Sequence, residues 1–278
     1  MLFEILKFII YSTLIVLISK YILVKLLRKL AENLNLKPKT VGDIAGYATS
    51  MPELLTIIIS SAKGLISVSI LNILSSNIIN LIQYFCSIIL NKNKKAFENK
   101  AIRVDLILVI FTILIPVLLL IFNIEINITI VPIFIILYII FMILNNNAHK
   151  LYLQKEDKKI ELEIEKEEKW ERGNKKKTIK YIIYLLLTGI LLFIIGELLG
   201  KTLEGLCYNF NISQTIIGIL LGLITSIPEL ITFFESQKHY KGKDEILGVI
   251  EATNNLLTSN LSNLFLIQSV GVLVYILI

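Results

Sequence analysis

The residues of this chain best suited to chemistry are two glutamates that lie in apolar stretches of sequence. Residues 42–56 (GDIAGYATSMPELLT) match residues 218–232 (GILLGLITSIPELIT) at a constant offset, and this match pairs Glu53 with Glu229. An ionised carboxylate within an apolar span is costly and by default marks a functional site. Two such residues in equivalent positions of a repeat therefore predict a shared ion-binding site.

Neutral oxygen atoms accompany each glutamate. A proline directly before each glutamate lacks an N–H, so the carbonyl oxygen four residues earlier loses its helical partner and becomes a free ligand. A second repeated pattern, LNILSSNIIN at 71–80 and NNLLTSNLSN at 254–263, adds hydroxyl and amide groups at helical spacing. The predicted ligands are the side chains of Glu53, Glu229, Thr49, Ser50, Thr225, Ser226, Ser76, Asn80, Ser259 and Asn263, with the carbonyls of Ala48 and Ile224.

This ligand set contains neither cysteine nor histidine. The chain has two cysteines and two histidines, too few for a disulfide framework or a histidine-rich metal site. Hard oxygen ligands in number suit Ca²⁺ or Na⁺ and not zinc or copper. We therefore expect Ca²⁺ and Na⁺, or H⁺, to be transported ions, and we expect no cofactor.

The elements that position these residues are predicted to be transmembrane helices. Of the 278 residues 55% are hydrophobic, and the charged residues gather in short segments. Eight stretches are near the roughly 20 residues that a helix needs to cross the hydrocarbon core. We expect an all-α membrane protein with eight transmembrane helices at 5–27, 40–62, 66–90, 104–123, 126–145, 179–200, 212–236 and 250–276.

Lysine and arginine residues set the expected orientation of these spans. They concentrate in the loops after the first, third and seventh spans and in the charged segment 146–178, and all four lie on one side if the spans alternate. The positive-inside rule makes that side cytoplasmic and places both termini outside. The net charge of +6 thus indicates topology and not nucleic-acid binding. We expect an integral protein of the plasma (cytoplasmic) membrane.

The charged segment also divides the chain. The predicted units are a first inverted repeat at 1–145 with the first copy of the repeated motifs (α-repeat 1) at 40–90, a cytoplasmic linker at 146–178, and an incomplete second inverted repeat at 179–278 with the second copy (α-repeat 2) at 212–276. The second span starts in the cytoplasm and the seventh starts outside, so the two copies are inverted. Inverted repeats whose interrupted helices meet at the midplane are the recurring architecture of secondary transporters.

At the repeated motifs the sequence resembles the calcium:cation antiporter superfamily, specifically the Na⁺/Ca²⁺ exchanger membrane family. The repeats of that family carry a G-T-S-x-P-E-type motif followed by G-S-N-x-x-N/D. This chain has ATSMPE with SSNIIN in the first copy and ITSIPE with TSNLSN in the second. The resemblance implies an inverted-repeat antiporter fold in which Glu53 and Glu229 are central ligands of Ca²⁺ and of the exchanged cation. The threonine and serine hydroxyls would then line flanking Na⁺ sites, while the first and sixth spans slide to alternate access.

The chain departs from the family pattern in two respects. Exchangers of this family often carry a third acid at the end of the second asparagine helix, where this chain has Asn263. The family usually has ten spans, and eight are visible here. The resemblance covers the second, third, seventh and eighth spans directly, and the other spans correspond by position only.

The sequence leaves several functions open. The leading one is an antiporter that exchanges Ca²⁺ for Na⁺ by alternating access in calcium homeostasis. The alternatives are Ca²⁺/H⁺ exchange with the glutamates as proton carriers, and a non-transporting membrane protein of the same fold. No nucleophile–base set, nucleotide-binding loop or zinc motif is present, so we expect no enzyme. Glu251 is interpreted as an acid at the membrane interface or a ligand on the access path, and Asp105 as an acid favoured by a helix N-terminus.

Overall fold

The computed structural model describes residues 2–34, 38–122, 127–152, 175–242 and 245–277, and every regular element in these ranges is a helix. Seven helices within them are long and apolar enough to cross a membrane. The remaining predicted span, the second (40–62), is built from two consecutive helices, α3 and α4, of 12 residues each. Residues 153–174 of the predicted linker 146–178 lie outside the described residues.

The helices follow the predicted spans closely. The first span is α1, a π-helical turn η1 and α2; the sixth is α9 with η3, and the eighth is α12, η4 and α13. The bounds are α1 Leu2–Ile18, η1 Ser19–Leu23, α2 Val24–Asn33, α3 Pro38–Thr49, α4 Met51–Ala62, α5 Ile66–Leu90, η2 Lys94–Glu98, α6 Lys100–Ile121, α7 Ile130–Tyr152, α9 Lys175–Glu204, η3 Gly205–Asn209, α10 Gln214–Thr225, α11 Ile227–His239, α12 Glu245–Leu261, η4 Ser262–Ile267 and α13 Gln268–Leu277.

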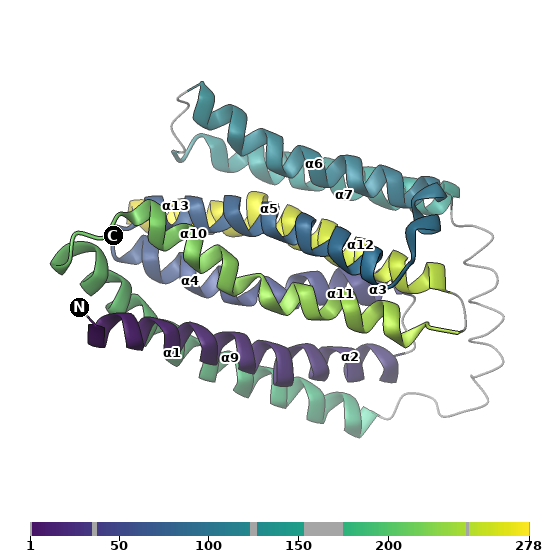
Figure 1. Ribbon diagram of the computed structural model, residues 1–278, viewed down its shortest axis with the longest axis horizontal. Helices are drawn as coiled ribbons and strands as arrows, with labels where there is room; N and C mark the ends of the chain where they lie inside the picture. The colour runs from purple at the N-terminus through teal and green to yellow at the C-terminus, as the bar shows by residue number, and fades with distance from the viewer. Residues whose placement is uncertain (1, 35–37, 123–126, 153–174, 243–244, 278) are drawn as a thin grey trace.

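The helices form three groups (Figure 1). Helices α3, α4, α5 and α10 to α13 make a central group, with α1, α2 and α9 on one side of it and α6 and α7 on the other. Both ends of the chain lie at one end of the bundle, whereas α2 and α11 end, and α12 begins, at the opposite end. We call that opposite end, where α7 also finishes and α9 starts, the linker side.

Two spans are broken at equivalent positions. Ser50 separates α3 from α4, and Ser226 separates α10 from α11. Pro52 and Pro228 stand in the first turn of the helix that follows, where a residue without an N–H is tolerated. The proline in each motif therefore ends one half-helix and begins the next.

Glycines let the broken helices approach the asparagine helices closely. A Cβ atom at Gly46 of α3 would lie 2.8 Å from the carbonyl oxygen of Asn255 on α12, and one at Gly222 of α10 would lie 2.8 Å from the carbonyl oxygen of Asn72 on α5. Small residues permit this packing in membranes, where van der Waals contact rather than water exclusion joins helices. The first half of each broken span, α3 or α10, thus packs on the asparagine helix of the other repeat.

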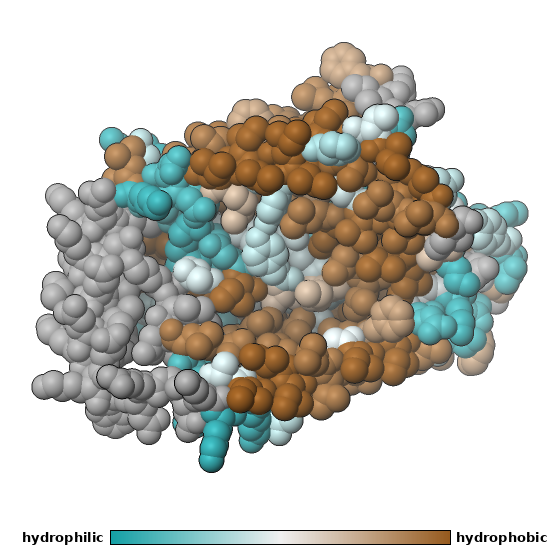
Figure 2. Space-filling model, turned by 180° about the vertical axis from the view of Figure 1, so that it is seen from behind, coloured by the Kyte–Doolittle hydropathy of each residue, from teal (hydrophilic) through white to brown (hydrophobic). Residues whose placement is uncertain are grey.

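The outer surface is apolar and the interior is rich in polar groups. Leucine, isoleucine and phenylalanine side chains are exposed along α6, α7 and α9, among them Leu186, Ile190 and Phe193. Figure 2 shows such hydrophobic side chains in broad bands over one face of the molecule. With seven membrane-length helices, this pattern is that of an integral membrane protein with several spans.

Candidate ion-binding site

The two repeated glutamates lie together in the middle of the central group. Glu53 is in the first turn of α4 and Glu229 in the first turn of α11, and neither side chain is exposed (0% for each). A helix N-terminus carries partial positive charge, so each broken span directs a stabilising dipole at its carboxylate. Two buried negative charges in one membrane-spanning group of helices favour a bound cation.

Hydroxyl groups from the breaks reach across to the asparagine helices. The Thr49 hydroxyl donates to the Asn255 side chain (3.3 Å), and the Thr225 hydroxyl donates to the Asn72 side chain at the same distance. This symmetry places the break of each repeat against the asparagine helix of the other.

The serines of the two motifs complete the surroundings of the glutamates. Ser50 and Ser259 share a hydrogen bond of 2.9 Å, and Ser259 donates to the Glu229 carboxylate (3.1 Å). Ser76 lies beside the Glu53 carboxylate and 3.4 Å from the Thr225 hydroxyl. Hydroxyl oxygens from both repeats therefore surround both carboxylates.

Asparagines join α5 and α12 at the centre of the site. The side-chain amide of Asn77 donates to the backbone carbonyl of Asn260 (3.2 Å), and that of Asn260 donates to the carbonyl of Asn77 (3.1 Å). Asn80 donates to the Asn260 side chain and Asn263 to the Asn77 side chain, at 3.2 Å each. Asn263 lies in the π-helical segment η4, an irregularity often found at functional sites.

Five buried oxygen atoms of these residues accept no hydrogen bond within the described part of the chain. They are both carboxylate oxygens of Glu53, Oε2 of Glu229, and the side-chain oxygens of Asn80 and Asn263. A buried acceptor left unpaired costs about 1–3 kcal/mol, and more when it is charged. Buried oxygen acceptors of this kind are the ligands that a hard cation prefers.

The structure brings most of the predicted ligands to this place. Those buried at the crossing of the broken and asparagine helices are Glu53, Glu229, Thr49, Ser50, Thr225, Ser76, Asn80, Ser259 and Asn263. Ser226 is buried there too, but its hydroxyl donates to the carbonyl of Gly222 in its own turn (2.7 Å). The side chains of Ala48 and Ile224 face the hydrophobic cluster that packs α1 and α9 against the site.

Four polar residues that support the site are absent from the predicted ligand set. Asn72 donates to Thr56 (2.8 Å), and Asn255 donates to Thr232. The two threonines in turn donate to the backbone carbonyls of the glutamates one turn earlier, at 2.9 and 2.8 Å. All four also repeat between the two copies, so the repeat itself was the signal that could have identified them.

Asp105 does not have the role expected from its place near the start of a span. It is fully buried, and its carboxylate oxygens lie 2.8 Å from His149 Nε2 and 2.7 Å from the Asn145 amide. The interpretation of Asp105 as an acid stabilised by a helix N-terminus is therefore replaced by a buried pair that joins α6 to α7. Asn254 of α12 contacts the same cluster.

Comparison with solved structures identifies the same fold. The chain is similar to the sodium-calcium exchanger NCX_Mj soaked with 10 mM Na⁺ and zero Ca²⁺, with 20% identity and a TM-score of 0.56 over 99% of this chain and 84% of that one. The same exchanger soaked with 100 mM Na⁺ and 10 mM Sr²⁺ matches with 20% identity and a TM-score of 0.55, over 99% and 83% of the two chains. Both structures were determined to describe extracellular ion exchange and induced occlusion of the binding site in that exchanger. A comparison with curated protein sequences finds no match.

The sequence profile of one family matches nearly the whole chain. That family is described as sodium/calcium exchanger protein, and the match covers residues 5–145 and 180–277. Each of the two matched ranges contains one copy of the glutamate motif and one copy of the asparagine motif. The predicted resemblance and the inverted-repeat, all-helical fold are thereby confirmed, and the chain belongs to the sodium/calcium exchanger family of membrane cation transporters, which are not enzymes.

Proposed function

We propose that this protein is a secondary antiporter that exchanges Ca²⁺ for Na⁺ by alternating access. The ions bind between Glu53 and Glu229, with hydroxyl and amide oxygens from both repeats as further ligands. The carbonyls of Ala48 and Ile224, whose amide partners the prolines remove, are assigned to the same ligand set.

The observation that carries this proposal is the group of five unpaired acceptor oxygens. Two carboxylates and two amide oxygens supply them, and all four side chains are fully buried. Two negative charges balance one Ca²⁺ or two Na⁺, and hard oxygen ligands are what both ions require. Without a bound ion or proton, these oxygens would carry a desolvation cost whenever the site is closed to water.

The same charge count favours a second candidate, Ca²⁺/H⁺ exchange. Only Glu53 and Glu229 bring charge to the site, since Asn80 and Asn263 are neutral. Two protons on the two carboxylates neutralise the site as fully as one Ca²⁺ does. The two candidates differ only in which ion replaces Ca²⁺, and the same flux assay separates them.

We assign the linker side to the cytoplasm and both termini to the outside, in the plasma membrane. The lysine-rich loops of the linker side support this orientation through the positive-inside rule. The units 1–145, 146–178 and 179–278 then correspond to a first repeat, a cytoplasmic linker and a second repeat of opposite orientation.

The test is ⁴⁵Ca²⁺ flux into proteoliposomes under an imposed Na⁺ gradient, repeated under a pH gradient. Glu53→Gln and Glu229→Gln should each reduce Ca²⁺ flux at least about a hundredfold, because leaving a buried charge without its partner costs about 3–5 kcal/mol. Glu197→Gln is the matched control, since that carboxylate is 57% exposed and pairs with Lys201 at the surface. Flux of the wild-type level in either site variant would refute the proposed ligands.

A further inference from the structure

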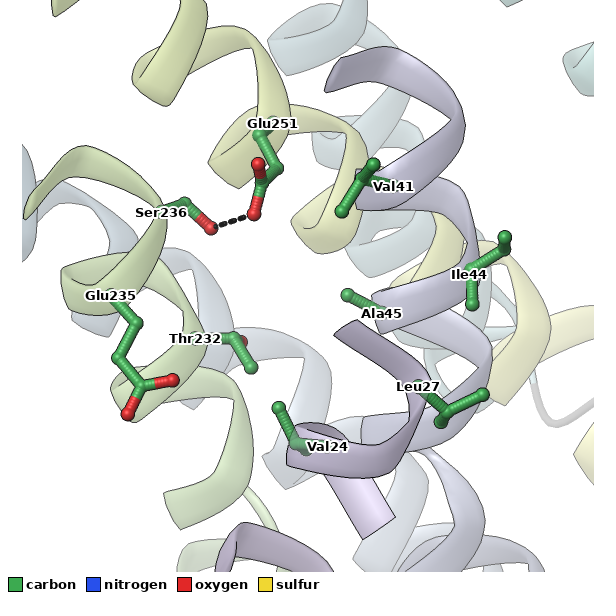
Figure 3. Close-up of a pocket in the computed structure, with 9 residues that line it drawn as sticks. All are labelled: Val24, Leu27, Val41, Ile44, Ala45, Thr232, Glu235, Ser236 and Glu251. Carbon is green, nitrogen blue, oxygen red and sulfur yellow. Dashed lines mark hydrogen bonds between the residues drawn. The ribbon is translucent and has the colours of Figure 1, made fainter. Parts of the chain in front are cut away.

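A small cleft, with a cavity volume of about 20 Å³, lies beside the ion site on the linker side. Apolar side chains of α2 and α3 line one wall of this cleft. The other wall carries oxygen atoms, from Thr232, Glu235 and Ser236 of α11 and Glu251 of α12 (Figure 3). A cation that passes through the cleft would therefore meet oxygen ligands along one wall only.

Glu251 is the more buried of the two carboxylates in this wall. Its side chain is only 3% exposed, and it accepts a hydrogen bond from Ser236 (2.7 Å), which faces it across the gap in Figure 3. Thr232 links the cleft to the ion site, because its hydroxyl donates to the backbone carbonyl of Glu229 (2.8 Å). The cleft thus reaches the first turn of the helix that carries one of the two central carboxylates.

The two repeats differ at these positions. At the offset that pairs Glu53 with Glu229, Glu235 corresponds to Ile59, and at the offset that pairs Asn72 with Asn255, Glu251 corresponds to Val68. Both first-repeat residues are buried and apolar. The repeats preserve the ligands at the centre, but at these two positions only the second repeat has carboxylates.

At the end of the bundle opposite the linker side, the residue equivalent to Glu235 is also tightly packed. Ile59 lies directly against α9, where a Cβ atom at Gly200 would be 1.9 Å from its Cγ2 atom. An apolar isoleucine therefore occupies, in the first repeat, the position that Glu235 occupies in the second. The two approaches to the site differ in both charge and packing.

We infer that Glu251, with Glu235 beside it, is a positioning residue that draws divalent cations from the linker side to Glu229 and raises the affinity for Ca²⁺ on that side alone. This inference rests on the proposed antiport. A carboxylate in a cleft with an apolar wall acts through a medium that screens poorly, so it concentrates cations near the site. The opposite approach, lined by Ile59 and Val68, has no equivalent carboxylate at these positions, so Ca²⁺ is captured less readily there.

The inference is tested in membrane vesicles of both orientations, with Ca²⁺ varied on one face at a time. Glu251→Gln keeps an acceptor for Ser236 while it removes the charge. The KM for Ca²⁺ on the linker side should rise about tenfold, as expected for a unit charge close to a divalent ion in a hydrated cleft, and the rise should shrink at high ionic strength. The maximal rate and the KM at the opposite face should stay unchanged.

Two further variants sharpen the result. A double variant, Glu235→Ile with Glu251→Val, copies the first repeat and should make the two faces nearly equal in KM. Glu245→Gln removes a charge from the exposed start of the same helix and should leave both KM values unchanged.

An unchanged KM on the linker side in Glu251→Gln, or an equal change on both faces, would overturn the inference and leave the antiport intact. Absence of Ca²⁺ flux in the wild-type protein would overturn the proposed function and this inference with it.

Discussion

The close contact between α10 and α5 can be tested with a single methyl group. In Gly222→Ala, the new Cβ would lie 2.8 Å from the carbonyl oxygen of Asn72 and 2.9 Å from the amide nitrogen of Ser76. Both are backbone atoms, so neither can rotate aside as a side chain would. The substitution must therefore move α10 away from α5, and with it Thr225 away from Asn72 and the site.

The expected magnitude follows from two opposing effects. Overpacking in a well-packed interior costs about 1–3 kcal/mol, and two backbone contacts under 3.0 Å place this variant toward the upper end of that range. Replacing glycine by alanine within a helix returns about 1 kcal/mol of helix propensity. The net loss of unfolding free energy should be about 1–2 kcal/mol, which corresponds to a fall of about 2–8 °C in Tm.

Gly189→Ala is the matched control, because a Cβ at Gly189 in the middle of α9 meets nothing within 4 Å. Gly189→Ala gains the same helix propensity without a steric clash. The difference in unfolding free energy between the two variants therefore measures the cost of the close contact at Gly222, about 2–3 kcal/mol. Thermal unfolding in detergent, with and without Ca²⁺, measures both variants. If Gly222→Ala had the same Tm as Gly189→Ala and bound Ca²⁺ as the wild type does, the close contact between α10 and α5 would not be required for the site.

Three other predictions concern charge, orientation and the buried pair outside the site. Asn263→Asp adds a third carboxylate to the predicted ligand set and should strengthen Na⁺ binding and the voltage dependence of Ca²⁺ flux. The flux is measured with the membrane potential clamped by valinomycin and K⁺. An unchanged voltage dependence would contradict the argument that the number of carboxylates sets the number of bound charges. Lys177→Cys and Lys201→Cys stand about 36 Å apart on α9, so an impermeant thiol reagent applied from outside should label only the second, and labelling of the first would reverse the topology. His149→Ala should destabilise the protein by about 3 kcal/mol by leaving Asp105 buried without its partner, and Asp105→Asn in the same chain should recover most of the loss in Tm; no recovery would show that the pair is not the cause.

The spans and the repeat were predictable from the sequence because both depend on local patterns. The length of an apolar stretch fixes whether a helix can cross the bilayer, and the predicted span 66–90 coincides with α5. Two copies of one motif are visible without any knowledge of contacts. The breaks at Ser50 and Ser226 also followed from the prolines two residues later.

The exchange of partners between the repeats was not predictable in this way. The motifs of one repeat are neighbours in sequence, but the glycines of α3 pack on α12 and those of α10 on α5. Glycine spacing shows that a helix has a close neighbour without saying which one. The pairing of Asp105 with His149 was missed for a similar reason, since the two residues lie 44 positions apart on different helices.

The paired asparagines also bear on how the chain enters the membrane. Asn77 on α5 finds its partner 183 positions later, so α5 is synthesised and inserted long before α12 exists. During that interval its amides face lipid or the insertion machinery, where an unmatched polar group is costly. Biogenesis of this transporter therefore includes a stage at which a polar helix must be sheltered until its counterpart arrives. A ribosome stalled before residue 245 would leave α5 in the membrane without α12 and expose it to quality control.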